Sequence, residues 1–182
     1  MKRFPHLQFA LCTLGVMTAG LTAIAQADSY DTISQAVLAT LHERSYHMSM
    51  TTPGGQTAEA DFVSPDRMHM TMPMGESTVI GKTVYLKMNG VWKNMGSADL
   101  MPSPVDAMKK LAAARSDTKV DDLGIRTVDG GVMHAYKVTN AKRNTVATVF
   151  IDSAGRIARE EIGTSVVRMS KFGEAVSIAA PI

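Results

Sequence analysis

Cysteine is almost absent from the sequence, which contains a single one, Cys12. Because Cys12 lies among the first 27 residues, residues 28–182 can form no disulfide, thiolate metal site or cysteine nucleophile. Leu11 precedes Cys12 at the place where the signal of a lipid-anchored protein needs a small residue. We therefore expect a protein that is not attached to a membrane through a lipidated cysteine.

An excess of charge of either sign is also absent. The chain has 19 lysine and arginine residues against 17 acidic residues, and two of the basic residues are Lys2 and Arg3. The first 27 residues contain no acidic residue, so residues 28–182 carry 17 basic and 17 acidic side chains. This balance argues against a nucleic-acid-binding surface and against long-range attraction to an anionic membrane.

The motifs of common hydrolases are missing as well. There is no G-x-S-x-G segment, and the histidines after residue 27 do not form the H-E-x-x-H or H-x-x-x-H spacing of zinc sites. Glu160 and Glu161 occupy successive positions of a predicted strand, so their side chains point to opposite faces and cannot act together as acid and base. We expect neither catalytic activity nor a cofactor.

The first 27 residues have the pattern of a secretory signal peptide. Lys2 and Arg3 precede an apolar stretch, and Ala25-Gln26-Ala27 is a typical cleavage site. No cluster of basic residues follows, which argues against the alternative of an uncleaved transmembrane helix. We expect a soluble periplasmic protein of a Gram-negative bacterium, with residues 28–182 forming one domain.

Apolar residues at helical spacing predict two helices, at residues 28–44 and 103–115. In the first, Ile33, Val37 and Leu41 recur every four residues. In the second, Ser103 precedes a proline at the first helical position, and Met108 belongs to the apolar stripe. Both stripes need a sheet to cover them.

Alternation with a period of two predicts roughly ten strands, joined mostly by tight turns. The segments that alternate in this way lie at 45–52, 56–63, 67–72, 76–80, 82–88, from 91, 118–128, 132–139, 145–151, 156–162, 166–172 and 175–179. An antiparallel sheet of this size must curl to hide one face. We predict an α+β fold, in which a strongly curved antiparallel β-sheet forms an open half-barrel around the two helices, which line or plug an apolar cavity.

Methionine is abundant, and 12 of the 14 methionines follow residue 27. Because methionine is flexible and polarizable, it suits an apolar surface that adapts to varied ligands. The residues predicted to bind a hydrophobic ligand are Met48, Met50, Phe62, Met68, Met70, Met72, Leu86, Met88, Trp92 and Met108. For Trp92, the alternatives are the mouth of a cavity and the edge of the sheet. Alternation alone does not distinguish a hollow sheet from a packed core.

The methionine clusters also suit copper, because thioether and imidazole groups are ligands of Cu(I). Residues 47–50 and 68–74 combine both types. Same-face residues of a strand lie about 7 Å apart, however, so one ion reaches three methionines only if the strand bends or if a neighbouring strand supplies a ligand. His47 and His69 are expected to point away from the methionines. Copper binding is therefore the weaker alternative.

The order of the predicted elements resembles that of the LolA/LolB/LppX-like superfamily of bacterial envelope proteins. The resemblance rests on a helix followed by a strand meander, on Pro65-Asp66-Arg67, on residues 81–95 (GKTVYLKMNGVWKNM), and on the ending RMSKFGEAVSI with Pro181. It implies an unclosed antiparallel barrel with helices as a lid over an apolar cavity. Members of this superfamily carry or sense lipids and the acyl chains of lipoproteins, and some relatives bind regulatory membrane proteins.

Three functions follow from these observations. The first is a soluble periplasmic carrier of lipid, acyl chain or another hydrophobic ligand. The second is an interaction or sensor module of the same fold, whose partner would be an envelope membrane protein. The third is a methionine-rich copper-binding protein. LolB and LppX relatives are lipid-anchored, and the missing anchor cysteine favours a soluble protein, which we expect to be a monomer.

Overall fold

The computed structural model describes residues 28–97, 110 and 113–182. The expected signal peptide at residues 1–27, most of the expected second helix and Met108 lie outside these ranges. Within them, Arg115–Asp117 forms a short 3-10 turn, η1, immediately before the seventh strand.

One α-helix, α1, runs from Ser29 to His42, close to the expected bounds. Asp28 caps it, because its Oδ1 accepts a hydrogen bond from the backbone N–H of Tyr30 at 3.1 Å. The buried residues of α1 recur every three or four positions and so lie on one side of the helix: Tyr30, Ile33, Ala36 and Thr40. Within the described part of the chain, no helix is both long and apolar enough to cross a membrane.

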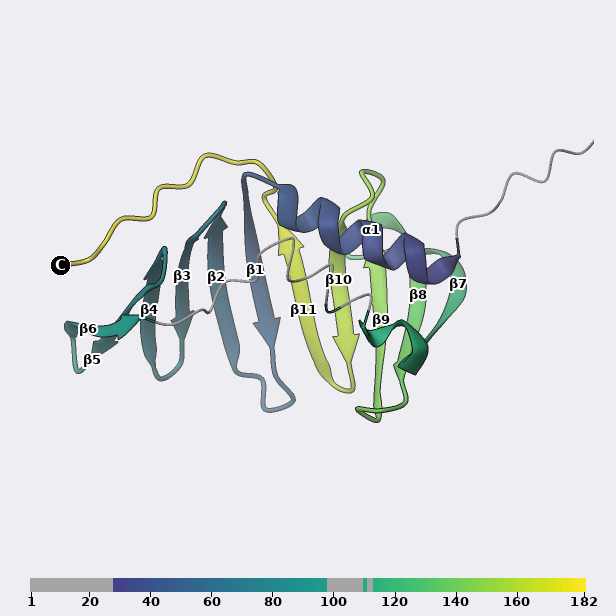
Figure 1. Cartoon of the computed structure of the whole chain (residues 1–182), viewed down its shortest axis with the longest axis horizontal. Helices are drawn as coiled ribbons and strands as arrows, with labels where there is room; N and C mark the ends of the chain where they lie inside the picture. The colour runs from purple at the N-terminus through teal and green to yellow at the C-terminus, as the bar shows by residue number, and fades with distance from the viewer. Residues whose placement is uncertain (1–27, 98–109, 111–112) are drawn as a thin grey trace, which may run out of the picture.

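Eleven strands form one antiparallel sheet (Figure 1). The strands before residue 98 are β1 (Ser45–Thr51), β2 (Thr57–Val63), β3 (Arg67–Met72), β4 (Gly75–Ile80), β5 (Thr83–Met88) and β6 (Val91–Ser97). The later strands are β7 (Thr118–Val128), β8 (Gly131–Asn140), β9 (Thr145–Ile151), β10 (Ile157–Ile162) and β11 (Ser165–Ser170). These bounds agree with the predicted strands to within about two residues.

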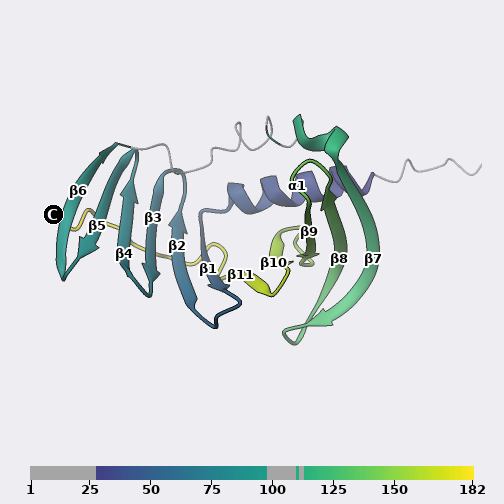
Figure 2. The same cartoon turned by 90° about the horizontal axis from the view of Figure 1, so that it is seen from below.

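The strand order places the two halves of the chain side by side. The order is β6-β5-β4-β3-β2-β1-β11-β10-β9-β8-β7, so the first strand pairs with the last in the middle of the sheet. β6 and β7 form the two edges and do not pair with each other. The sheet is therefore open, and Figure 2 shows it bending around α1 at the β7–β9 end.

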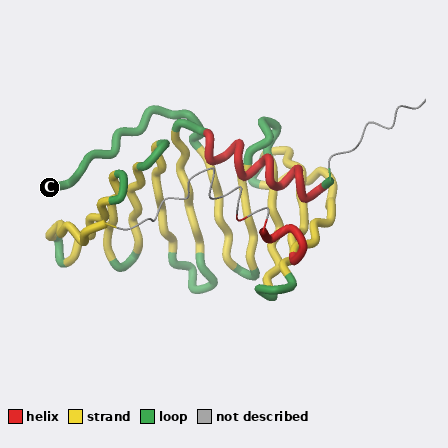
Figure 3. The backbone as a smooth tube through the Cα atoms, viewed as in Figure 1, coloured by secondary structure: helices red, strands yellow, loops and turns green. Residues whose placement is uncertain are grey.

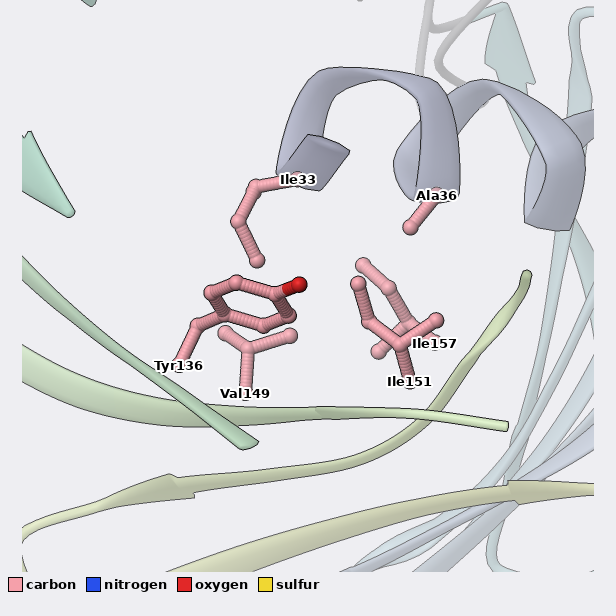
Figure 4. Close-up of a cluster of buried hydrophobic side chains, with 6 residues drawn as sticks. All are labelled: Ile33, Ala36, Tyr136, Val149, Ile151 and Ile157. Carbon is pink, nitrogen blue, oxygen red and sulfur yellow. The ribbon is translucent and has the colours of Figure 1, made fainter. Parts of the chain in front are cut away.

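Helix α1 packs on β8, β9 and β10 through a core of six buried side chains (Figure 4). These are Ile33, Ala36, Tyr136, Val149, Ile151 and Ile157. The hydroxyl of Thr40 accepts a hydrogen bond from the N–H of Ile157 and donates one to the carbonyl of Ala36, both at 2.9 Å. The curved, open antiparallel sheet with a helix on one face confirms the predicted fold class in that respect.

The prediction of a strand at residues 175–179 is wrong. No helix or strand follows Ser170, and Figure 3 shows residues 171–182 as a loop. β1 and β10 already occupy both edges of β11, so this segment cannot form a hairpin with the strand that precedes it. The segment is held elsewhere: Arg67 Nη1 donates a hydrogen bond to the carbonyl oxygen of Ile178 at 2.7 Å, and Ile178 is only 6% exposed.

Candidate functional site

The strand register gathers most of the predicted ligand-binding residues on one face of the sheet. Met48 lies opposite Ala60, which lies opposite Met70, and Met70 lies opposite Ser77 beside Leu86. Residues directly opposite each other point to the same side. We call the resulting surface the methionine face; its members are Met48, Met50, Phe62, Met68, Met70, Met72, Leu86 and Met88.

Packing is tight in the part of the methionine face formed by β2 to β5. Met68, Val79 and Val84 form a buried cluster, with Val79 only 1% exposed, and Phe62 and Met70 pack against it. Tyr46 stacks on Phe62 with ring centroids 4.6 Å apart. Burial raises the pKa of the Tyr46 phenol to about 12, so the ring enters this surface as a neutral group.

The methionine face is continuous with the core beneath α1. Met169 of β11 lies opposite Met48 of β1 and also packs against the α1 core. The apolar surface therefore extends from β5 across the centre of the sheet to β8. The alternation of single strands did not reveal this continuity, because it depends on the pairing of β1 with β11.

Trp92, which was grouped with the methionine-face residues, does not point to that side; it lies on β6 at the edge of the sheet, which was one of the two placements predicted for it. Trp92 lies opposite Lys87, which lies opposite Glu76, and this row faces the other side of the sheet. Met88 and Val91 flank the Asn89-Gly90 turn as a pair, so the next residue, Trp92, must point the opposite way. Lys87 Nζ lies 5.8 Å from the centre of the indole ring.

Ion pairs dominate the opposite side of the sheet, which we call the charged face; it carries His47, Glu59, Asp61, Glu76, Lys87, Arg159, Glu161 and Arg168. His47 lies between Glu59 and Asp61, at 2.8 and 2.7 Å. A hydrogen bond from Lys87 lowers the pKa of Glu76. The prediction that His47 and His69 point away from the methionines is confirmed, because both flank Asp61 in the register.

A cleft of about 310 Å³ lies between the charged face and the C-terminal segment. Its walls are Asp61, His69, Thr78 and Trp92 from the sheet and Val176, Ser177, Ile178, Ala179 and Pro181 from the segment. Nδ1 of His69 lies 3.0 Å from the hydroxyl of Thr78. The sequence did not predict this cleft, because its outer wall was expected to be a strand.

The carboxyl group of Glu160 lies on the same side of the sheet as the methionines. Glu160 is opposite Val149 on one neighbouring strand and Val167 on the other, and Val167 is opposite Met50. Burial raises the pKa of Glu160. Glu161 points to the charged face, where Arg159 binds it at 2.7 Å. The two glutamates thus face opposite sides, as predicted.

The register does not favour a copper site. β2 separates β1 from β3, so Ala60 lies between Met48 and Met70, and the methionines of the two strands are not direct neighbours. In the described ranges, no three or more histidine and acidic side chains are grouped so that they could hold a metal ion.

Comparison with solved structures identifies the fold. The crystal structure of lipoprotein LppX from Mycobacterium tuberculosis matches with a TM-score of 0.58 and 19% identity, over 83% of this chain and 98% of LppX. The chain has an LppX-like fold. LprF from Mycobacterium bovis matches with a TM-score of 0.57 and 19% identity, over 84% of this chain and 96% of LprF. The resemblance to LolA/LolB/LppX-like proteins is thereby confirmed at the level of the fold.

The LppX-like fold also matches a protein solved together with a partner. In the MucA/MucB complex of Pseudomonas aeruginosa, the TM-score is 0.53 with 16% identity, over 86% of this chain and 59% of the matched chain. No protein-family model matches the sequence, and no curated protein matches it by sequence. At these identities the likeness concerns the fold, and function must be argued from the two faces of the sheet.

Proposed function

We propose that this protein is an exported periplasmic carrier or binder of lipid, acyl chain or another hydrophobic ligand, held non-covalently on the methionine face. The observation that carries the proposal is the separation of the two faces. The register places Met48, Met50, Met68, Met70 and Met72 on one side, whereas ion pairs occupy the other. No catalytic step is assigned to the protein.

The chemistry of the methionine face suits an adaptable apolar ligand. Methionine has three rotatable side-chain bonds and a polarizable sulfur, so a row of methionines can repack around chains of different shape. Each methylene group removed from water contributes about 0.8 kcal/mol, so a chain of about twelve carbons gains roughly 10 kcal/mol before the cost of association. This gain is sufficient for binding without any specific polar contact.

A matched pair of substitutions on β3 tests this function. Met70 lies on the methionine face and its neighbour Thr71 on the other, so Met70→Gln and Thr71→Gln introduce the same side chain on opposite sides. Titration with the uncharged fluorescent dye Nile red measures apolar binding. We expect Met70→Gln to weaken it roughly fivefold to tenfold, the effect of ~1 kcal/mol of lost apolar contact.

In the same titration, Thr71→Gln should leave the affinity for Nile red unchanged. Saturable binding that is insensitive to both substitutions would place the ligand elsewhere. An unmodified protein that takes up no Nile red after extraction with solvent would contradict a carrier function altogether.

The second candidate function is a protein-interaction module of the cell envelope. It is supported by the fold shared with the chain of the MucA/MucB complex. In this case apolar side chains would fill the methionine face, and a surface would recognise an envelope protein. Failure to bind Nile red, together with co-purification of one envelope protein at a fixed ratio, would favour this function over the carrier.

A further inference from the structure

Glu160 lies in a setting that is unusual for a carboxyl group. Its cross-strand neighbours on β9 and β11 are Val149 and Val167. Along its own strand, the nearest residues on the same side are Ile157 and Ile162. Four apolar residues are therefore its neighbours on this side of the sheet, and Met50 lies two strands away.

A β-bulge in β10 produces this placement. Ile157 pairs with Ile151 and Arg159 pairs with Phe150, so Ala158 is an extra residue without a partner on β9. The extra residue puts Ile157 and Glu160 on the same side of the sheet. Arg159 and Glu161 turn to the charged face and pair with each other. Glu160 is thus the charged residue of β10 that meets the apolar surface.

Among the residues that the structure describes, none forms a hydrogen bond or an ion pair with Glu160. The residues of the neighbouring strands on this side of the sheet are Ala147, Val149 and Ile151 of β9 and Val167 and Met169 of β11. The buried side chains of α1, which packs on the same side, are Tyr30, Ile33, Ala36 and Thr40. The titratable groups on this side are Tyr30 of α1, Tyr136 of β8 and, beyond Tyr136, the ion pair of His134 with Asp122. Arg156, before β10, already binds Glu43 and Asp152.

An unpaired carboxylate among apolar side chains is energetically costly, and a cation that bonds to it removes part of the cost. The methionine face begins close by: β11 alone separates Glu160 from Met50, a distance of roughly 10 Å at the usual spacing of strands. A ligand whose chain lies on the methionine face can therefore reach Glu160 with its polar end.

We infer that the ligand of this protein is a long-chain amine, whose protonated amino group donates hydrogen bonds to the Glu160 carboxylate while its alkyl chain lies on the methionine face. The inference rests on the proposed carrier function and adds the chemical class of the ligand. It follows from complementary charge: the apolar surface offers one acidic group and no basic group from β9, β10, β11 or α1 in the described residues.

The test compares dodecylamine with dodecanol, which share the alkyl chain but differ in charge. Isothermal titration calorimetry at pH 7.5 gives the affinity ratio of amine to alcohol for the exported protein made from the full chain, for Glu160→Gln and for Glu161→Gln. The last variant removes the same charge from the charged face. We expect the ratio of amine affinity to alcohol affinity to fall about tenfold or more in Glu160→Gln, because one charge-assisted hydrogen bond contributes about that factor. In Glu161→Gln the ratio should stay unchanged.

Equal ratios in the unmodified protein and in Glu160→Gln would overturn the inference while leaving the carrier function intact. Failure of both dodecylamine and dodecanol to bind the unmodified protein would overturn the carrier function as well. Glu160→Asp retains the charge and should keep a preference for the amine, which guards against a loss that comes from altered packing.

The pH dependence supplies a second readout. Lowering the pH protonates Glu160, whereas the amine stays charged, so the affinity for dodecylamine should fall in the unmodified protein. The affinity for dodecanol should not follow this trend, and Glu160→Gln should bind the amine with no such dependence. The same pH profile in the unmodified protein and in Glu160→Gln would contradict the role of Glu160.

Discussion

At the scale of single residues, the burial of Glu160 imposes a pH-dependent cost on folding. Burial raises its pKa in the folded state above the unfolded value, so the fold favours the protonated form. The contribution of Glu160 to the free energy of unfolding is therefore fully present at low pH, where the carboxyl is protonated. It is lost as the pH rises through the folded pKa. The unliganded protein is therefore less stable at neutral pH than it would be without this charge.

Replacing Glu160 by glutamine should remove that cost. At pH 7.5 we expect Glu160→Gln to melt about 2–4 °C higher than the unmodified protein, the shift that ~1 kcal/mol produces in a domain of this size. Below about pH 4 the two should melt together, because the glutamate is then uncharged. Thermal unfolding followed by circular dichroism measures both. A lower melting temperature of the variant at pH 7.5 would mean that a stabilising partner binds this carboxylate.

The orientation of single side chains could be predicted only where a strand is regular. In β1 to β3 the alternation correctly separated Met48, Met50 and Met70 from His47 and His69. For Trp92 it failed, because the geometry of the preceding two-residue turn, and not the aromatic character of the residue, decides its side.

Glu160 marks the limit of such reasoning. Strict alternation would place Ile157 on the same side as Arg159 and Glu161, and only the bulge at Ala158 brings it beside Glu160. Nothing in the local sequence indicates that bulge, because it depends on how β10 pairs with β9.

At the scale of elements, α1 is the part of the fold whose packing is best defined. Ile33 is 7% exposed and contacts the core that Tyr136 and Val149 form on the sheet. We expect Ile33→Ala to lower the free energy of unfolding by about 2–5 kcal/mol, because it leaves a cavity. Unfolding in urea, followed by circular dichroism, measures the change.

The control lies on the same helix. Gln35 is exposed, so Gln35→Ala should change the stability by less than about 0.5 kcal/mol. If both variants lost the same free energy, α1 would not be docked on the sheet through Ile33.

Element positions were largely predictable from local patterns. The apolar spacing of α1 was visible in the sequence, and so were the tight turns between strands. The segment after Ser170 was not, because its alternation is that of a strand, whereas the edges of β11 are already taken by β1 and β10. Local patterns cannot show whether a partner edge is free.

At the scale of the whole molecule, the pairing of β1 with β11 determines the shape of the apolar surface. It joins the β1–β6 half to the half that carries α1, so that the methionine face and the α1 core form one continuous surface. The order of distant strands is not encoded in alternation. The resemblance to LolA/LolB/LppX-like proteins implied an unclosed antiparallel sheet but not this strand order, and the match to LppX confirms the fold.

The separation of an apolar face from a charged face gives the molecule its proposed role. On the charged face, the side chains form ion pairs with one another, and the C-terminal segment lies against this face. The methionine face offers flexible apolar side chains and a nearby acid. A ligand with an alkyl chain and a basic end is complementary to this combination.

The measurement to make first is native mass spectrometry of the exported protein, before and after extraction with organic solvent. We predict the mass of residues 28–182 together with additional masses that disappear on extraction and match lipid or acyl-chain amphiphiles. A single mass without adducts before extraction, from protein that is folded by circular dichroism, would contradict the carrier function and favour the interaction module.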